Sequence, residues 1–299
     1  MDEPAATDAS TPSLARGTLL ILLTAVMWSF NGPLIKLLVE AEAGAWTIAF
    51  YRSLIAGVAL TPFALRRVGQ LRFDRWLIVC VFVYAAMTAT FILATTMTQA
   101  ANAIALQYTA PIFVFALSPL FLGERTSGRD WLVLTVALAG VGVIFLGQGG
   151  TPELPGLIIG LTSGLFFGLL TLVLRRVRHI DPLLVTWINC LGSAAVLFPV
   201  TAAHSTVAID GKQLGLLVVL GVFQFGIPYL LYASALRVVP AYRAALLTLI
   251  EPVLNPTWTF LIVSEVPANT TLAGGALIVT AVALQILITT WARQTSPKH

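Results

Sequence analysis

Two stretches of the sequence decide the fold: TAPIFVFALSPLFLGE at residues 109–124 and IEPVLNPTWTFLIVSE at residues 250–265. They align without a gap when the numbering is shifted by 141 residues, which brings Pro111 onto Pro252. Both stretches are apolar, and the second carries Glu251 next to its first proline. Proline and carboxylate are both unfavourable within a helix surrounded by lipid. We therefore expect the two stretches to do more than span the membrane. We also expect the repeat to extend beyond them.

The composition is that of an integral membrane protein. The chain has 299 residues, of which 58% are hydrophobic and 10% charged, and its mean hydropathy is +0.91. Soluble domains carry about 25% charged residues, which cover their surface in water. The lipid bilayer is thus the expected environment. The formal net charge of +4 reports topology rather than a nucleic-acid partner, and none is predicted.

The sequence shows no pattern typical of a disulfide framework, a metal site or a catalytic site. The two cysteines, Cys80 and Cys190, lie far apart in apolar runs, and the three histidines are scattered over loops and the tail. This pattern predicts neither a disulfide framework nor a metal site. No phosphate-binding loop and no catalytic motif is present, so we expect no cofactor, no ATP hydrolysis and no enzymatic activity.

The hydrophobic runs predict an all-α protein with ten transmembrane helices, since a helix needs about 20 apolar residues to cross the hydrocarbon. An N-terminal stretch without a basic region or cleavage site is expected to stay as a disordered cytoplasmic tail over residues 1–16. Residues 293–299 form the second predicted tail. The predicted spans are 17–38, 45–64, 76–97, 100–122, 131–147, 155–174, 182–200, 213–234, 240–263 and 271–291.

The basic residues predict the orientation. With ten spans and both termini on one side, 14 of the 17 lysine and arginine residues fall on that side. Only Lys36 and Lys212 fall on the other, and Arg52 lies within a span. Because cytoplasmic loops are enriched in lysine and arginine, we expect both termini to be cytoplasmic.

The repeat covers five helices. The first and sixth spans align with a shift of 139 residues, which brings Trp28 onto Phe167, and Glu124 falls on Glu265 in the alignment above. Five is odd, so the two copies, residues 17–148 and 149–292, have opposite orientations in the membrane. Inverted repeats are typical of secondary transporters, whose substrate sites lie near the midplane between the copies. A channel, which would need a ring of carbonyls or charges, fits less well.

The motifs resemble those of the drug/metabolite transporter superfamily, EamA-type branch, and most closely its YddG type. They are the AP…GE pair (Ala110, Pro111, Gly123, Glu124), the EP…SE pair (Glu251, Pro252, Ser264, Glu265), AVMWSFNGPLIK at 25–36 and FYRSLIAG at 50–57. The resemblance implies a ten-helix exporter of small molecules. For the YddG type, it implies export of aromatic amino acids and some cationic drugs.

Two charges within the spans are the main candidates for transport. Glu251 forms a polar stripe with Thr248, Asn255 and Thr259 at helical spacing. Its carboxylate either faces a cavity, where it contacts a substrate amine or carries a proton, or accepts hydrogen bonds at a proline kink. Arg52 either binds a carboxylate, of Glu251 or of the substrate, or extends toward the interface and backbone carbonyls.

A central cavity lined by aromatic rings with sparse amide and hydroxyl groups is predicted from the remaining residues. The predicted lining is Trp28, Asn31, Arg52, Tyr84, Thr88, Gln107, Tyr108, Trp187, Asn189, Gln224, Tyr229, Tyr232, Glu251 and Asn255. Helix kinks are expected at Pro111, Pro252 and Pro256. Gly160, Gly164 and Gly168 predict either tight packing of the sixth span or a sliding surface.

The predicted function is export of small amphipathic metabolites across a bacterial inner membrane by alternating access. Phosphorylated substrates would favour several basic residues in the cavity, and only Arg52 is available at that depth. Aromatic or other hydrophobic amino acids fit the predicted lining best. The alternative is a drug or organic-cation/proton antiporter of the same fold. A monomer is compatible with the sequence, which leaves the oligomeric state open.

Overall fold

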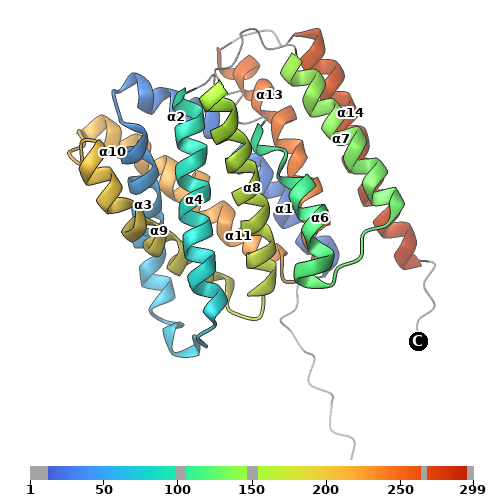
Figure 1. Cartoon of the computed structure of the whole chain (residues 1–299), viewed down its shortest axis with the longest axis horizontal. Helices are drawn as coiled ribbons and strands as arrows, with labels where there is room; N and C mark the ends of the chain where they lie inside the picture. Colours follow the sequence, from blue (N-terminus) through green and yellow to red (C-terminus); the bar gives the residue numbers. More distant parts are fainter. Residues whose placement is uncertain (1–12, 98–105, 147–153, 264–267, 295–299) are drawn as a thin grey trace, which may run out of the picture.

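The computed structural model describes residues 13–97, 106–146, 154–263 and 268–294, and every regular element in these ranges is helical (Figure 1). The first half comprises α1 (Leu14–Trp28), α2 (Asn31–Glu40), α3 (Ala45–Ala64), the 3-10 helix η1 (Val68–Gln70), α4 (Arg75–Met97), α6 (Ala110–Leu122) and α7 (Gly128–Leu146). The second half comprises α8 (Leu154–Arg176), α9 (Pro182–His204), α10 (Gly211–Val218), the π-helix η2 (Val219–Gly226), α11 (Ile227–Ala235), α12 (Ala241–Leu247), the 3-10 helix η3 (Thr248–Ile250), α13 (Glu251–Val263) and α14 (Asn269–Gln294).

The predicted class, an all-α integral membrane protein, is confirmed. Within the described ranges, 8 helices are long and apolar enough to cross a bilayer, and α6 is a shorter apolar helix. The expected spans 100–122 and 240–263 are not single helices of full length there. The first contains the turn at Tyr108–Thr109, and the second is divided by η3. The count of ten therefore stays a prediction, as does the orientation in the membrane.

The two interruptions match each other and follow the repeat. α6 begins at Ala110 and α13 at Glu251, positions related by the 141-residue shift, and each helix has 13 residues. Pro111 and Pro252 stand at the second helical position of α6 and α13. Proline has no N–H to donate to the carbonyl four residues earlier, so it favours a helix that starts anew at this point. Pro256 lies within α13, and its side chain is outside what the structure describes.

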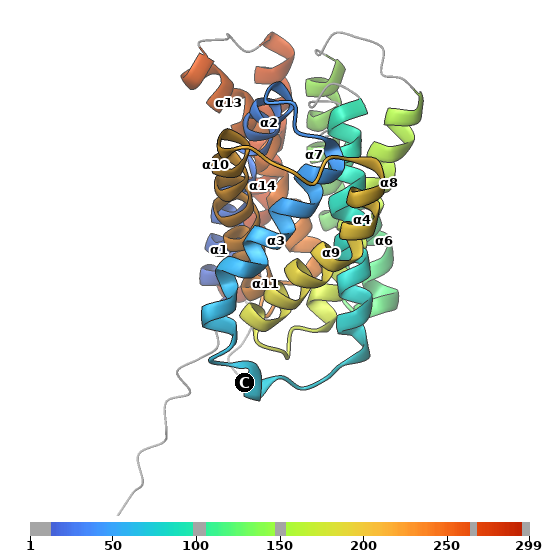
Figure 2. The same ribbon diagram turned by 90° about the vertical axis from the view of Figure 1, so that its left-hand side faces the viewer.

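The helices form one bundle in which corresponding pairs pack in corresponding ways. α4 packs against α8, and α1 packs against α11. α3 and α9 lie side by side (Figure 2), while α7 and α14 pair at one edge of the bundle (Figure 1). Because these helices of one half pack against helices of the other half, both halves contribute residues to the core.

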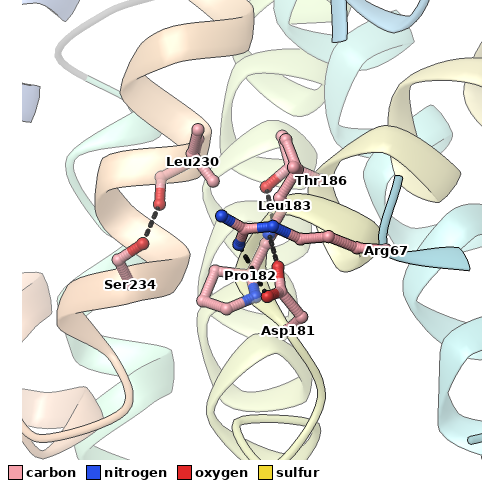
Figure 3. A network of polar contacts seen from close by, with 7 residues as sticks. All are labelled: Arg67, Asp181, Pro182, Leu183, Thr186, Leu230 and Ser234. Carbon is pink, nitrogen blue, oxygen red and sulfur yellow. Dashed lines mark hydrogen bonds and ion pairs between the residues drawn. The ribbon is translucent and has the colours of Figure 1, made fainter. Parts of the chain in front are cut away.

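The loops rich in arginine gather at one end of the bundle, which we call the basic end: loops 65–74, 123–127, 177–181 and 236–240 (Figure 1). One of its contacts joins the two halves (Figure 3). Nη1 of Arg67, just after α3, lies 2.9 Å from a carboxylate oxygen of Asp181. Asp181 also caps α9, since its other oxygen accepts the backbone N–H of Leu183 at 2.8 Å.

Glycines of α8 bring this helix close to the interrupted fourth span. A Cβ on Gly164 would touch Oγ1 of Thr109 and lie 2.9 Å from the carbonyl oxygen of Leu106. A Cβ on Gly168 would lie 3.0 Å from the carbonyl oxygen of Ala110. The glycine run thus packs against backbone at the turn before α6, which is the tight-packing alternative of the two expected from the sequence.

Candidate functional site

A small cavity lies in the middle of the bundle, between the two halves. Its volume is about 20 Å³, which is room for about one water molecule. The protein is therefore contracted around the site, and an organic substrate needs the walls to move apart. The residues lining it are Trp28, Asn31, Arg52, Met87, Phe91, Gln107, Phe167, Gln224, Phe225, Tyr229 and Glu251.

Much of the cavity wall is built where helices are interrupted. Trp28 ends α1 and Asn31 begins α2. Gln224 lies in the π-helix η2, and Glu251 begins α13. Such irregular backbone at membrane depth is tolerated where it lines a cavity, and π-bulges recur at functional sites. This is the arrangement in which secondary transporters place their substrates.

Aromatic rings form one side of the cavity. The ring centroid of Trp28 lies 5.4 Å from that of Phe167 and 5.0 Å from that of Tyr229. Phe225 packs edge to face on Tyr229, with centroids 5.0 Å apart. These separations are those of favourable aromatic pairs, so the rings hold each other as a rigid wall for a flat apolar group.

Arg52 places a positive charge on the cavity beside these rings. It is 2% exposed, and its guanidinium carbon lies 4.3 Å from the ring centroid of Phe225 and 5.8 Å from that of Phe91. Stacking on aromatic faces partly compensates the charge for its burial. Its Nε has no hydrogen-bond partner, and Arg52 makes no ion pair with any residue that the structure describes. The guanidinium thus keeps capacity for an anionic group.

Glu251 places a carboxylate on the same cavity. It is 9% exposed and stands at the first position of α13, where the helix dipole favours negative charge. The hydroxyl of Tyr108 lies near it without the geometry of a hydrogen bond. In the described part of the chain, Glu251 forms no ion pair. Thr248, above it in the predicted stripe, donates to the carbonyl of Ala245 at 2.8 Å.

Half of the predicted lining reaches the cavity, and half does not. The predicted residues that line it are Trp28, Asn31, Arg52, Gln107, Gln224, Tyr229 and Glu251. The other lining residues, Met87, Phe91, Phe167 and Phe225, are absent from the predicted lining. Phe167 could have been found from its alignment with Trp28, whereas nothing in the sequence distinguishes Met87 or Phe225 from ordinary packing. The predicted residues that do not line it are Tyr84, Thr88, Tyr108, Trp187, Asn189, Tyr232 and Asn255.

Several of these residues support the cavity from behind. The hydroxyl of Tyr84 contacts Sγ of Cys190 at 3.7 Å, and its ring packs on Tyr229. Nδ2 of Asn189 donates to Sγ of Cys80 at 3.1 Å. The hydroxyl of Tyr84 and the amide nitrogen of Asn189 are thus used in contacts between helices rather than at the cavity.

Tyr232 and Trp187 are likewise held by other helices. The hydroxyl of Tyr232 bonds that of Thr171 at 3.0 Å. Trp187 leaves the site altogether, because its Nε1 donates to Oγ1 of Thr61 at 3.0 Å, near the end of α3.

A partly buried network ties the two halves together at the basic end. Gly123 ends α6 in the left-handed conformation, with φ 67°, which glycine adopts without strain. The next residue, Glu124, accepts from Nε of Arg175 at 2.7 Å and from the backbone N–H of Ala241 at 2.8 Å. Nη1 of Arg175 also donates to the carbonyl of Leu236 at 2.6 Å. The GE motif of the first half is thereby tied to the second half at two places.

Comparison with known proteins identifies one matching family profile and several relatives. The profile of the EamA-like transporter family matches residues 15–146 and again 154–287. An uncharacterized transporter of Archaeoglobus fulgidus is 31% identical over 272 residues, which cover 89% of this chain and 94% of that protein. The pseudopaline exporter CntI of Pseudomonas aeruginosa is 29% identical over 90% of this chain and 95% of its own. The S-adenosylmethionine uptake transporter of Rickettsia felis is 24% identical over 87% of this chain and 88% of its own.

One solved structure matches the fold with a TM-score of 0.80. The match covers 91% of this chain and 98% of the other, at 20% sequence identity.

Proposed function

The chain belongs to the EamA-like transporter family, and we propose that it exports aromatic or other hydrophobic amino acids by alternating access through the central cavity. Membership of the family makes it a multi-pass membrane transporter of small molecules and not an enzyme. The finer proposal concerns the class of substrate, the direction of transport and the residues that bind the substrate.

The observation that carries the proposal is a pair of opposite charges on one cavity that do not neutralise each other. Arg52 and Glu251 both line it, and neither has an ion-pair partner among the described residues. A zwitterion satisfies both, with its carboxylate on Arg52 and its ammonium group on Glu251. Trp28 and Phe167 would then hold an aromatic side chain between the halves.

The contracted cavity and the partly buried network at the basic end support alternating access. Glu124 and Arg175 tie the two halves together at the basic end. We propose that the basic end faces the cytoplasm, since basic residues mark cytoplasmic loops, and that the membrane is a bacterial inner membrane. Both termini would then be cytoplasmic, and export requires this network to open and reform.

The test uses liposomes that contain only the purified protein. Labelled phenylalanine, tryptophan, threonine and a flat organic cation are compared, with and without an imposed pH gradient. Saturable movement of the aromatic amino acids ahead of threonine is expected. If none of the amino acids moves, the proposed substrate class is wrong, although the family assignment stands.

The roles of the two charges are tested with substrate analogues. Phenethylamine lacks the carboxylate of phenylalanine, and phenylpropionate lacks the ammonium group. Arg52→Gln should abolish the preference for phenylalanine over phenethylamine, and Glu251→Gln the preference over phenylpropionate. Tyr84→Phe, which changes a residue behind the cavity wall, is the matched control and should keep both preferences. If both preferences survive Arg52→Gln and Glu251→Gln, these residues have structural roles.

A second candidate, an organic-cation/proton antiporter, is favoured by one feature. Glu251 lies on the cavity together with Trp28, Phe167 and Tyr229, and aromatic rings beside a carboxylate recognise organic cations. In the same liposomes, uphill movement of the flat cation that depends on the pH gradient, without movement of phenylalanine, would select this function over the first.

A further inference from the structure

A second and much larger pocket lies outside the central cavity, at the basic end. Its volume is about 610 Å³. It is formed by the start of α4, the end of α6 and the turn after α8, three segments that the fold brings together because α8 packs against both α4 and α6. Its lining is Asp74, Arg75, Trp76, Leu122, Glu124, Arg175, Arg176, Arg178 and His179.

The pocket carries uncompensated positive charge. Both acidic residues on it are already engaged, Asp74 with His179 at 3.3 Å and Glu124 with Arg175 at 2.7 Å. The other three arginines, Arg75, Arg176 and Arg178, make no ion pair in the part of the chain that the structure describes. Arg178 is also close enough to Arg175 for their like charges to repel. An anion in the pocket would relieve this repulsion.

The side chain of Arg176 is exposed, but two contacts hold its guanidinium in place. Its guanidinium carbon lies 5.7 Å from the ring centroid of Trp76, and its Nη1 donates to the carbonyl of Phe121 at 3.4 Å. A planar guanidinium fixed in this way presents its remaining donors to an oxyanion in a defined direction. Phosphate oxygens are well suited to such donors.

The pocket opens beside an apolar surface. Arg75, Ile78, Val79 and Phe82 follow one face of α4 at helical spacing, and the last three are 50%, 40% and 58% exposed. On α6, which packs against α8 as α4 does, Leu120 is 80% and Phe121 41% exposed. In a membrane protein these side chains face lipid tails, while tryptophan, the residue type of Trp76, is enriched at the membrane interface.

From this arrangement we propose that the pocket binds the phosphate headgroup of an anionic phospholipid. The phosphate lies against Arg75, Arg176 and Arg178, and the acyl chains run along the exposed faces of α4 and α6. A soluble phosphate would use the arginines alone and leave the adjacent apolar surface without a role. The pocket is distinct from the substrate cavity, and its occupancy does not depend on which substrate is carried.

Binding is measured on the purified full-length protein in detergent micelles. Dioleoyl phosphatidylglycerol and dioleoyl phosphatidylcholine, which share their acyl chains, are titrated separately, and retained lipid is counted by native mass spectrometry. We expect phosphatidylglycerol to be retained preferentially. Each basic residue near a lipid phosphate contributes a factor of about five to binding, so Arg75→Gln/Arg178→Gln should weaken retention by about 25-fold.

The matched control removes the same charge from the same end. Arg125 and Arg129 lie in the loop after α6 and at the start of α7 and do not line the pocket, so Arg125→Gln/Arg129→Gln should bind as the unmodified protein does. Arg75→Lys/Arg178→Lys keeps the charges and should restore retention, which separates loss of charge from loss of folding.

Three outcomes would overturn the proposal. Equal retention of the two lipids would show that the headgroup is not recognised. An equal loss in the control variant would show that only the total charge matters. Displacement of phosphatidylglycerol by glycerol 3-phosphate at matching concentration would identify a soluble phosphate ester as the ligand instead.

Discussion

Trp28 and Phe167 meet edge to face, with ring centroids 5.4 Å apart, although they come from opposite halves of the chain. They occupy equivalent positions of the repeat, so their contact lies where the two halves face each other. Both rings line the central cavity. The cavity is therefore built around the relationship between the halves, as expected for a transporter in which one half moves against the other.

The aromatic wall should select the size of the substrate. Trp28→Ala removes the ring that contacts Phe167 and Tyr229, and aromatic pairs contribute about 0.5–1.5 kcal/mol beyond burial. Flux of phenylalanine and tryptophan in liposomes should fall by about tenfold, since about 1.4 kcal/mol corresponds to that factor. Flux of threonine should change less. Equal losses for all three amino acids would assign Trp28 to packing.

If Glu251 carries a proton during transport, it should couple transport to the pH gradient. Glu251→Gln keeps the size of the side chain and removes its titration, so accumulation driven by a pH gradient should disappear while downhill flux persists. Glu40→Gln, at the exposed end of α2, removes the same charge away from the cavity and should keep the coupling. Uphill transport that survives Glu251→Gln would exclude Glu251 as the proton site and leave it the role of holding the start of α13.

Two of the ion pairs that join the halves at the basic end, Glu124–Arg175 and Arg67–Asp181, should differ in their contribution to stability. Glu124 and Arg175 have side chains only 13% and 9% exposed, and breaking a buried pair costs about 3–5 kcal/mol. Arg67 is 53% exposed in its pair with Asp181, and exposed pairs contribute about 0–1 kcal/mol. Glu124→Gln should therefore lower the free energy of unfolding in detergent far more than Arg67→Gln. Similar losses would mean that the Glu124–Arg175 network is open to water.

Glycine in α8 should matter only where the helix touches its neighbour. Gly164→Ala places a methyl group against Thr109 and the carbonyl of Leu106, and overpacking of this kind costs about 1–3 kcal/mol. Gly142 lies in α7, where a methyl group would meet no atom within 4 Å, so Gly142→Ala should be neutral or stabilising by about 0.5–1 kcal/mol. Thermal unfolding of the two variants compares these effects, and a stable Gly164→Ala protein would argue for a loose, sliding contact at this position.

The membrane class and the repeat could be predicted from the sequence because both depend on local composition. About twenty apolar residues specify a span wherever they occur, and proline interrupts a helix through its own missing N–H. The matched starts of α6 and α13 are a consequence of Pro111 and Pro252, independent of their surroundings.

Only the tertiary structure decided which residues line the cavity. In a membrane bundle, the surfaces facing lipid and those facing other helices are both apolar, so hydrophobic periodicity does not show how each helix is rotated. Trp187 and Arg52 are both polar-tipped side chains within spans, yet one bonds Thr61 and the other stacks on Phe225 beside the cavity. The sequence by itself determined an all-helical membrane protein with a repeat and interrupted helices. The packing of one half against the other decided that Arg52 and Glu251 share a cavity without pairing, because that depends on helix rotations which no local pattern encodes.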